Sequence, residues 1–523
     1  MAAVVMLGVD LGGRVFVGND EARFAVLAQD VLAHGHWWFP RVNVETVYQN
    51  KPLLLAWLIA LVSWPAGHVT QLTAVVPSAL AALATALVVG ALAGAALGAT
   101  AGLVDALVTL TSHGLVFHAR VPLPDMLMTA GMTASVWMLW RLRVGRPHAW
   151  IGFYGFAVAA FWAKGTAGLL PLVVAVAWWI VDRPEGGWSM LRLPAGALGV
   201  LALIAPWWVV TLTGPRTSVG GGVMVDQVLW YLPRLTSVDT LVEPLKNLSG
   251  VLFPWALLVP LVLAHAARTL RARDAEGEAL RFIGVWAAVL FVLVALSRQQ
   301  RYRYYLPLVP PLALLIGWWW AALFEGAPVR RVPWKTYGAI VAVLFVSAIG
   351  SLVAPASWPR SLRVTGSAPL AEIALAVMGL AAVGWALALV ARSGRMRAVF
   401  AVACAAAGAG LLVANHAETV RRNHAWDYPG LARRLGPALP AGALVVAPES
   451  QDLAVGFYLD RPTIAVVDPR LGQAIAGRSA LAAILTDEER ERYGASLPGE
   501  PYATESLGRG RVTVTIHPRP AGG

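Results

Sequence analysis

The sequence predicts an all-α protein that crosses a membrane many times and carries a small mixed α/β domain at its C-terminal end. Of the 523 residues, 58% are hydrophobic and only 13% are charged, whereas about a quarter of a soluble chain is charged. The apolar residues gather in runs of about 18 to 25, which is the length that a helix needs to cross a bilayer. We expect about 13 transmembrane helices, near residues 52–68, 70–95, 98–117, 125–140, 149–163, 165–181, 193–213, 248–266, 281–296, 304–323, 334–354, 369–391 and 397–415.

The charge and the cysteine content argue against other classes. The net charge of +12 comes largely from short loops between apolar runs, where the positive-inside rule explains it. The cations are not interleaved with aromatic residues on one soluble face, so we do not expect a nucleic-acid partner. The single cysteine, Cys404, lies inside an apolar run and cannot form a disulfide framework or a thiolate cluster.

The basic loops also predict the side of the membrane that each loop faces. Loops rich in arginine and lysine alternate with poor ones, and the rich loops belong in the cytoplasm. Counting crossings back from the C-terminus conflicts with an external loop at residues 18–51. Residues 69–125 would have to cross an odd number of times but look like two helices, so we expect one of them to be re-entrant or short. The cytoplasmic loops are 141–146, 268–281, 330–335 and 392–397, and the outer side receives Lys164, residues 214–247, 297–303 and 355–368, and everything after His416.

The N-terminal segment, residues 1–17, is apolar but short, and Asp10 and Arg14 interrupt it. It lacks the basic start and the small-residue cleavage site of a secretory signal. We interpret it as the remainder of a first membrane span, clipped by a misassigned start codon.

Beyond residue 416 the sequence changes to short apolar and alternating runs that are typical of strands. About 100 residues suffice for a small α/β domain. We therefore divide the chain into a membrane domain, residues 1–415, and an outer, periplasmic domain, residues 416–523. We expect strands at 442–447 and 463–467, helices at 450–459 and 479–493, and an edge strand at 511–516.

A polar stretch opens the first external loop, residues 18–51. Asn19 is a good helix N-cap, and Asp20 and Glu21 occupy the first turn, where acids complement the helix dipole. Arg23 lies three residues after Asp20 and shares its helix face. A helix-start group and an exposed ion pair would explain these charges, but charged groups between membrane spans are by default a functional hypothesis. We predict a site for an anionic, lipid-linked substrate.

The rest of this loop predicts a surface helix followed by a cation. Residues 24–33 are apolar at helical spacing, which is typical of a helix that lies along a membrane surface. A helix cannot turn His34 and His36 towards one metal, so we assign no metal ligand. Lys51 precedes Pro52, which is acceptable at the start of a helix. Lys51 is therefore either a snorkelling anchor or a substrate ligand.

Several motifs occur in the order in which the GT-C glycosyltransferases have them. Within that superfamily the sequence resembles the lipid A aminoarabinose transferases and, more distantly, the protein O-mannosyltransferases. The resemblance covers residues 15–325, and the shared order carries it because each motif alone is weak. The motifs are Asp20-Glu21-Ala22-Arg23-Phe24-Ala25, Lys51-Pro52-Leu53-Leu54-Leu55-Ala56-Trp57, Arg120-x4-Asp125-Met126-Leu127, Ala163-Lys164-Gly165, Pro254-Trp255, Leu296-Ser297, and Tyr304-Tyr305-Leu306-Pro307 with Pro310.

The resemblance implies roles for particular residues. By position, Asp20 is the acid that acts as catalytic base or lies beside the reaction, and Asp125 is the second acidic position. Lys51 would contact the phosphate of a polyprenyl phosphate-sugar donor. Tyr304 would line the pocket for the lipid phosphate. The other expected substrate ligands, assigned from charge and position, are Glu21, Arg23, Arg301 and Arg303.

Two departures from the family concern metal binding. The aminoarabinose transferases usually have glutamate where this chain has Asn50, and they have a histidine in the long external loop, whereas residues 215–250 contain none. Those positions serve a metal in the relatives, so a divalent metal is an open alternative here rather than an expectation. Asn50 also weakens the case for aminoarabinose as the sugar.

Together these observations predict an inverting membrane glycosyltransferase that uses a polyprenyl phosphate-sugar donor, by resemblance undecaprenyl phosphate. The acceptor would be lipid A, another envelope glycan or a protein hydroxyl. Cations would stabilise the phosphate that leaves, and a carboxylate can serve as base. No Gly-x4-Gly-Lys-Ser/Thr loop occurs, which argues against a nucleotide-sugar donor. We expect the site on the periplasmic face of a bacterial inner membrane.

Two other classes stay open. A transporter would show internal repeats and charges at mid-membrane, whereas we find no repeat and the charges gather at one face. A non-catalytic envelope assembly protein predicts that neither Asp20 nor Lys51 matters. Substituting Asp20 separates the classes, because only an enzyme should lose turnover while it still binds the donor.

Overall fold

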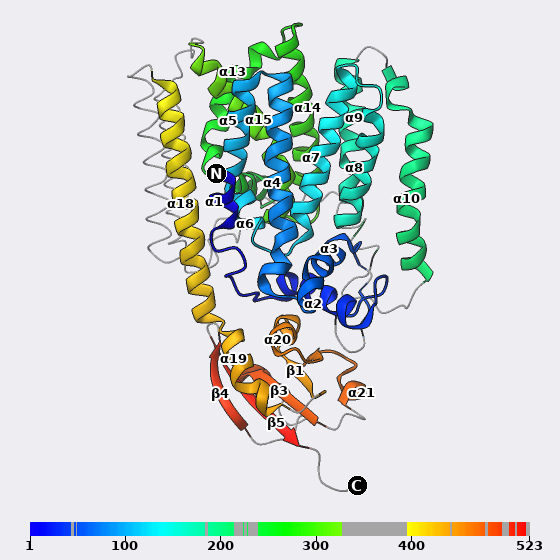
Figure 1. Ribbon diagram of the computed structural model, residues 1–523, viewed down its shortest axis with the longest axis vertical. Coiled ribbons are helices and arrows are strands. Elements are labelled where there is room, and N and C mark those ends of the chain that lie inside the picture. Colours follow the sequence, from blue (N-terminus) through cyan, green and yellow to red (C-terminus); the bar gives the residue numbers. More distant parts are fainter. Residues whose placement is uncertain are drawn as a thin grey trace.

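Long helices stand side by side in a bundle, and a five-stranded sheet with short helices lies beyond one end of it (Figure 1). We call this end of the bundle the sheet end, and the other the opposite end. The computed structural model describes residues 1–326 and 395–518, apart from residues 43–45, 49, 184–186, 214–222, 224–226, 228–238, 440–441, 476–479, 494–500 and 508–509.

Capping groups mark the ends of some of the helices. The Thr70 hydroxyl accepts a hydrogen bond from the Thr73 N–H at the start of α4, and Asp274 caps α14 in the same way. Gly35 ends α2 with a φ of 70°, a conformation that favours glycine. The helices up to the end of the bundle are α1 (Ala2–Gly8), α2 (Asn19–His34), α3 (Leu54–Ser63), α4 (Gln71–Ala96), α5 (Ala99–Leu110), α6 (His113–His118), α7 (Pro124–Arg143), α8 (Ala149–Lys164), α9 (Leu170–Asp182), α10 (Leu193–Thr213), α12 (Asp239–Leu252), α13 (Val259–Thr269), α14 (Ala275–Ala295), α15 (Val309–Phe324) and α18 (Met396–Ala425), with 3-10 turns η1 (Trp64–Ala66), η2 (Thr166–Leu169), η3 (Gly187–Leu191), η5 (Trp255–Leu258) and η6 (Tyr302–Leu308).

Among the described residues, five helical segments are long and apolar enough to cross a membrane, or six if the bent pair α12 and α13 counts as one span. The segment of η6 and α15 lies at the centre, because 94% of its most apolar stretch is buried. For the peripheral helices α10 and α18 the buried share of that stretch is 22% and 28%. Helices exposed in this way present apolar side chains to lipid. The predicted runs 334–354 and 369–391 lie outside the described residues, so the expected number of spans stays a prediction.

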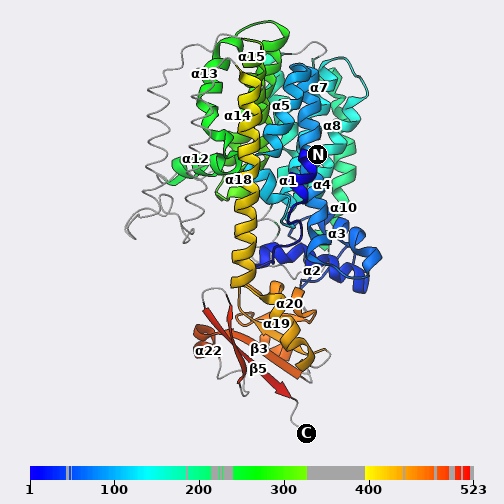
Figure 2. The same ribbon diagram turned by 60° about the vertical axis from the view of Figure 1, so that its left-hand side comes forward.

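The predicted run 52–68 does not form a spanning helix. It contains α3, which has 10 residues and is therefore about 15 Å long, half the thickness of the hydrocarbon core. Figures 1 and 2 show α3 beside α2 at the sheet end. Pro52 before the helix and Pro65 after it confine this apolar run to a short helix.

This short helix resolves the conflict in the count of crossings. The Gln71 side chain donates to the Arg14 carbonyl at 2.8 Å, so α4 starts beside the first loop. Asp125, at the start of α7, also lies at the sheet end, as the site shows below. Residues 69–125 thus start and end at the same end of the bundle, which argues against the odd number of crossings that we expected. The expected re-entrant or short helix rested on that odd number; α5, with 12 residues, is shorter than α4, with 26.

The C-terminal sheet has the strand order β2-β1-β3-β5-β4. β1 pairs in parallel with β2 and β3, and β5 pairs antiparallel with β3 and β4. Leu444, Val446 and Leu485 belong to its own apolar core. The strands and helices are α19 (Tyr428–Leu435), η8 (Gly436–Ala438), β1 (Leu444–Ala447), α20 (Asp452–Leu459), β2 (Thr463–Ala465), α21 (Leu471–Ile475), β3 (Ala480–Thr486), α22 (Asp487–Tyr493), β4 (Pro501–Leu507) and β5 (Gly510–Pro518).

Two sequence predictions for this region are wrong. The predicted helix at 479–493 is the strand β3 followed by the short helix α22, because only its second half is charged. The predicted edge strand at 511–516 is β5, which lies between two partners. The predicted domain boundary at 416 falls inside α18, which runs unbroken from the bundle towards the sheet (Figure 1).

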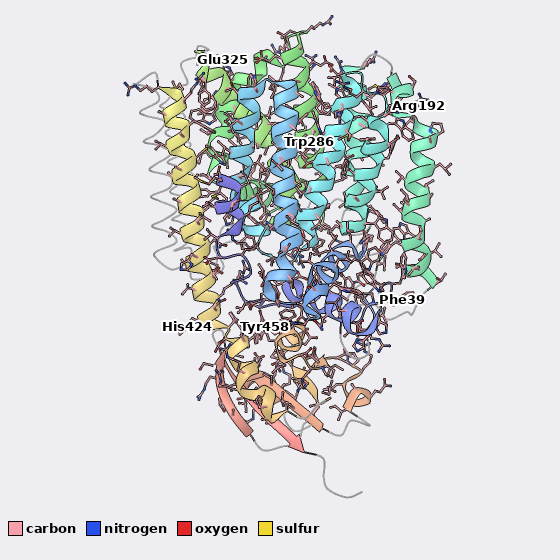
Figure 3. All side chains as sticks on the ribbon, viewed as in Figure 1. Phe39, Arg192, Trp286, Glu325, His424 and Tyr458 are labelled. Atoms are coloured by element: carbon pink, nitrogen blue, oxygen red, sulfur yellow. The ribbon has the colours of Figure 1, made fainter. Side chains whose placement is uncertain are left out.

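Hydrogen bonds hold the C-terminal part against the first loop. Tyr458, which Figure 3 marks at this junction, accepts a hydrogen bond from the Phe16 N–H at 2.8 Å. The Asn19 amide donates to Asp452 at 2.6 Å and accepts from the Leu453 N–H at 3.0 Å. Asn19, which we predicted as the cap of its own helix, therefore connects α2 with α20. This contact fixes the start of α2, where the predicted catalytic acid lies.

Candidate active site

Arg303 joins the two acids that the sequence predicts for the site. Its Nη2 donates to Asp20 Oδ2 at 2.9 Å, and its Nε lies 4.0 Å from Asp125 Oδ2. Asp20 stands in the first turn of α2, Asp125 in the first turn of α7, and Arg303 in η6. Three segments that are far apart in the sequence thus meet at the sheet end of the bundle.

Asp20 is surrounded by arginines. Arg23 Nη1 donates to its Oδ1 at 2.9 Å, one helical turn away, and Arg301 Nη1 donates to its Oδ2 at 3.0 Å. Burial by itself would raise the pKa of this carboxyl, but Arg303, Arg23 and Arg301 outweigh it and hold the pKa of Asp20 well below its usual range. Asp20 is therefore ionised at any physiological pH.

Lys164 completes the cluster from the end of α8. Its ammonium forms an ion pair with Asp125, and the two side chains are only 4% and 1% exposed. The same ammonium lies 4.3 Å from the centre of the Tyr304 ring, a favourable cation–π distance. Buried charges are stable only when they are paired, so Asp125, Lys164 and Arg303 form one interdependent group.

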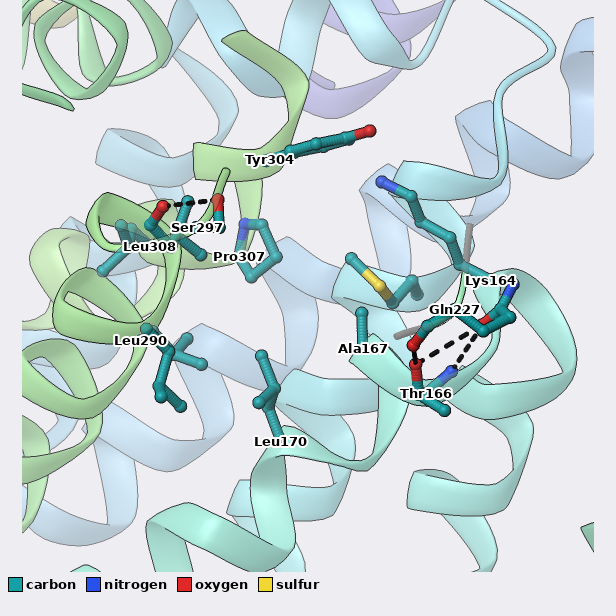
Figure 4. Close-up of a pocket in the computed structure, with 13 residues that line it drawn as sticks. Lys164, Thr166, Ala167, Leu170, Gln227, Leu290, Ser297, Tyr304, Pro307 and Leu308 are labelled. Carbon is teal, nitrogen blue, oxygen red and sulfur yellow. Dashed lines mark hydrogen bonds between the residues drawn. The ribbon is translucent and has the colours of Figure 1, made fainter. Parts of the chain in front are cut away.

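An apolar cavity of about 370 Å³ opens beside this group. Figure 4 shows Lys164 pointing towards Tyr304 at one side of it, while aliphatic side chains, together with Thr166, Gln227 and Ser297, form the rest of the wall. The cavity therefore has one cationic corner and a mainly hydrocarbon lining. The residues around it are Met128, Lys164, Thr166, Ala167, Leu170, Gln227, Leu290, Leu293, Val294, Ser297, Tyr304, Pro307 and Leu308.

Lys51 follows a backbone segment that is attached to the wall of this cavity. Gln227, which lines the cavity, donates through its Nε2 to the Asn50 carbonyl at 2.9 Å. The Gln227 side chain also accepts from the Thr166 N–H at 3.0 Å. The backbone just before Lys51 is thus attached to the cavity wall, although the half-buried Lys51 does not itself line the cavity.

Glu21 belongs to a different set of ion pairs. It pairs with Arg14 at 2.5 Å and with Arg422 of α18 at 3.0 Å, and its Oε2 accepts from the Val17 N–H. These bonds attach the start of α2 to α18. Glu21 nevertheless lines, together with Asp20, Arg301 and Arg303, a second cavity of about 510 Å³. Glu21 thus lies beside the cluster but pairs with other cations, and its expected role as a substrate ligand stays a prediction.

The site residues predicted from the sequence divide accordingly. Asp20, Asp125, Arg23, Arg301 and Arg303 come together in one cluster. Lys164 and Gln227 were missed as site residues. Lys164 carried a signal, because a lysine at the end of an apolar run is costly in a membrane unless it is functional. Gln227 lies in the long stretch between two predicted membrane runs, where the sequence has no recognisable pattern, and no sequence signal would have found it.

Such an arrangement suits one kind of ligand. Two carboxylates, Asp20 and Asp125, face the cations of Arg23, Arg301, Arg303 and Lys164, which leaves a surplus of two positive charges. An anionic group can balance this surplus, and the apolar cavity can accept a hydrocarbon chain attached to it. Fixed cations also stabilise negative charge that develops during a reaction.

Comparisons with known proteins agree with this geometry. A family model described as dolichyl-phosphate-mannose-protein mannosyltransferase matches residues 50–210. An undecaprenyl phosphate-alpha-4-amino-4-deoxy-L-arabinose arabinosyl transferase of Pectobacterium atrosepticum is 24% identical over 366 residues, covering 66% of this chain and 62% of the relative. The protein of the same name from Edwardsiella ictaluri is 26% identical over 336 residues, covering 59% and 56%. The chain thus matches about three fifths of the length of these curated relatives.

Solved structures show the fold. The crystal structure of ArnT from Cupriavidus metallidurans bound to undecaprenyl phosphate superposes with a TM-score of 0.75 and 22% identity, over 98% of this chain and 96% of that chain. Its apo state gives a TM-score of 0.74. This chain therefore has the mostly helical GT-C fold of ArnT, and the resemblance expected from the motifs is confirmed.

Proposed function

We propose that this chain is an inverting membrane glycosyltransferase that transfers a sugar from a polyprenyl phosphate, with undecaprenyl phosphate as the first candidate, to an acceptor of the cell envelope. The observation that carries the proposal is Arg303, which joins Asp20 and Asp125 directly beside an apolar cavity with a cationic corner. The names of the relatives and the undecaprenyl phosphate bound to ArnT support the same donor class.

The donor would bind with its phosphate at the cationic corner and its first isoprene units in the apolar cavity. Lys164 and Tyr304 border that corner, and Lys51 follows a backbone segment attached to the cavity wall. Arg303 stands between the corner and Asp20. We assign these three cations to the donor phosphate, and Tyr304 to the wall against which the phosphate or the first isoprene packs.

In the reaction, an acceptor oxygen forms a new bond to the anomeric carbon while the bond from that carbon to the phosphate oxygen breaks. The phosphate leaves with the electron pair, and cations already in place stabilise its growing charge. Attack from the opposite face inverts the anomeric centre. Asp20 would receive the acceptor proton, or would orient the acceptor when no proton has to leave.

The surroundings of Asp20 favour an acidic acceptor. A carboxylate held by three arginines is a weak base, and a weak base removes a proton poorly from an ordinary sugar or protein hydroxyl. A phosphate oxygen of a lipid such as lipid A is already ionised and needs no base. Among the expected acceptors we therefore place phosphorylated lipids first, other glycans second and protein hydroxyls last.

We further propose that the sheet end faces the periplasm of a bacterial inner membrane. Ionised Asp20 and half-exposed Arg301 at this end require contact with water. The arginines predicted to face the cytoplasm include Arg143 and Arg281, which pair with carboxylates from other helices at the opposite end. In this arrangement residues 1–415 form the catalytic membrane domain, and residues 416–523 form an outer α/β domain that helps to present the acceptor.

Replacing Asp20 by asparagine tests the proposal. Purified protein is incubated with radiolabelled polyprenyl phosphate-sugars and with phosphorylated lipid, glycan or peptide acceptors. We expect Asp20→Asn to lower the transfer rate by about 100-fold or more, because an amide cannot receive the acceptor proton and orients the acceptor less well than a carboxylate. Donor binding should persist, because the cationic corner stays intact. Arg146→Ala, an exposed cation in the 141–146 loop, is the matched control and should keep full activity.

Two results would contradict the proposal. If the wild type transfers no sugar from any polyprenyl phosphate donor to any acceptor, the assigned reaction is wrong. If Asp20→Asn and Arg146→Ala have equal activity at equal protein levels, the site is misplaced even though the reaction exists.

A further inference from the structure

A second group of titratable side chains lies at the other end of α2 and takes no part in the proposed reaction. His34 Nδ1 lies 3.0 Å from Asp30 Oδ1, and His36 Nδ1 lies 2.9 Å from Asp30 Oδ2. One ligand atom from each of the three residues lies within 4.8 Å of the others. About ten residues of helix, or roughly 15 Å, separate this group from Asp20.

The end of the helix explains why these residues meet. Asp30 and His34 are four residues apart and share one face of α2. Gly35 then adopts a left-handed conformation, φ 70° and ψ 22°, which turns the chain back. The His36 ring therefore stacks on the His34 ring, with centroids 5.5 Å apart and an angle of 19° between the planes. We expected that two histidines so spaced cannot face one metal, which is true within a continuous helix. Here the helix ends at His34 and Gly35 turns the chain back, so the expectation does not apply.

Other groups prepare this cluster for a cation. The Arg41 backbone N–H donates to Asp30 Oδ2 at 2.8 Å and so fixes the carboxylate from outside, which is a common feature of metal ligands. The carbonyl end of α2 carries a partial negative charge that favours cations. Two imidazoles and one carboxylate are a ligand set that zinc accepts.

The cluster borders a cavity of about 690 Å³ between the first loop and the C-terminal part. Asp30, His34 and His36 line one side of it, and residues of α20 and β2, among them Tyr458 and Thr463, line the other. An ion held by the three side chains would thus have room for a fourth ligand on the side of the cavity. Three protein ligands with one open position are typical of zinc sites that bind water or a further group.

We propose that Asp30, His34 and His36 form a zinc site with one open coordination position facing this cavity. The ion would lie where the Nδ1 atoms of the two histidines now face the Asp30 carboxylate, and would fix the chain that follows α2, in which Figure 3 labels Phe39. The fourth ligand is a water molecule or an anionic oxygen. The alternative is a hydrogen-bonded network in which each histidine only donates to Asp30.

The metal itself is the probe. Full-length protein in detergent is stripped with a chelator, exchanged into metal-free buffer above pH 7, and titrated calorimetrically with zinc. We expect one zinc per chain, with affinity lowered at least tenfold in His34→Ala, His36→Ala and Asp30→Asn. His148→Ala removes an exposed histidine from another loop and should bind zinc as the wild type does, as should His68→Ala, which lines the same cavity outside the cluster.

A second measurement does not depend on affinity. Cobalt bound in place of zinc should give visible absorption in the wild type and in His148→Ala, and lose it in His34→Ala and His36→Ala. Melting curves in chelator show whether each variant is folded, because without metal all of them should melt with the wild type. Absence of zinc binding by the wild type, or equal binding by the wild type and a folded His34→Ala/His36→Ala double variant, overturns the proposal. Neither outcome bears on the transferase activity.

Discussion

The two ends of the helical bundle both contain ion pairs between distant helices, but the pairs are organised differently. At the opposite end Arg143 pairs with Glu278, and Arg281 pairs with Asp182 at 2.7 Å. Each of these arginines faces one carboxylate, so the charges of the two pairs balance. At the sheet end Arg303 is shared by Asp20 and Asp125, and Asp20 accepts bonds from three arginines.

The two ends of the bundle therefore differ in whether their charges need a further partner. Balanced pairs between helices need no further partner and serve to hold helices together. A surplus of positive charge beside an apolar cavity is unfavourable unless an anion arrives, because like charges held close together repel. We infer that the sheet end is organised for a ligand and the opposite end for structure.

The strongest test replaces an arginine at each end. Arg303→Gln should lower the transfer rate by about 1,000-fold, since it removes a fixed donor for the leaving phosphate and the connection between the two acids. Arg143→Gln, at the opposite end, should keep the rate within about threefold, because a partly exposed pair contributes little. Transfer rates at equal amounts of folded protein provide the measurement. Similar losses for the two variants would mean that the ends do not differ in function.

The next test concerns stability. Lys164→Met leaves Asp125 buried with only Arg303 nearby, and breaking a buried pair costs about 3–5 kcal/mol. Arg281→Met breaks a more exposed pair, in which the side chains are 22% and 10% exposed, and should cost less. Thermal unfolding in detergent compares the two variants. An equal or larger loss for Arg281→Met would show that burial does not set the difference.

A third test measures how the stability contributed by Asp452, in the C-terminal part, depends on pH. Burial raises the pKa of Asp452, the partner of Asn19, to about 6. The folded protein thus keeps this proton up to about pH 6, whereas the unfolded chain releases it near pH 4. Because the folded state binds more protons in that window, the contribution of Asp452 to stability falls as the pH rises through it.

Asp452→Asn should therefore be more stable than the wild type at pH 8, by at most about 3 kcal/mol in the free energy of unfolding, and should melt at a higher temperature. At pH 4 the two proteins should be equally stable. Asp468→Asn is the control of opposite sign. Its hydrogen bond and ion pair with Arg470 lower the pKa of Asp468, so this carboxylate stabilises the fold at neutral pH and loses that effect as the pH falls. If both variants shift in the same direction at pH 8, the assignment of Asp452 is wrong.

The smallest effect is expected within the cluster itself. Arg301 is 45% exposed, whereas Arg303 is 15% exposed, and exposed pairs contribute about 0.2–1 kcal/mol. Arg301→Ala should lower the transfer rate by about fivefold or less, and the loss should shrink further in high salt. A loss as large as that of Arg303→Gln would contradict the ranking by burial.

Much of the site could be predicted because its charges stand out against an apolar sequence. Asp20 was identified from its position in the family motif, and Arg301 and Arg303 from their charge and their side of the membrane; the structure brings the three within hydrogen-bond distance. Lys51 was also identified from the family motif, and its role stays a prediction. Lys164 was recognised only as part of a motif, because a single lysine next to an apolar run also fits an interfacial anchor.

Errors in the fold came from patterns that describe one element but not its neighbours. The run 52–68 has the composition of a membrane helix, yet only Leu54–Ser63 forms the main helix, with prolines before and after it. The alternation at 511–516 correctly indicates a strand, but period-two alternation does not show how many partners a strand has. His34 and His36 were judged by the geometry of one continuous helix, but α2 ends at His34, two residues before His36.

The class of the protein, the position of most helices and the types of charge at the site could be predicted from the sequence alone. These follow from local composition, since the cost of placing charged or unpaired backbone groups in lipid fixes where helices run and where ions must gather. That Arg303 stands between Asp20 and Asp125, that Lys164 lies beside them, and that Gly35 folds His36 onto His34 became visible only in the folded chain. Each of these contacts depends on packing between segments or on one backbone turn, and neither leaves a periodic signal in the chain.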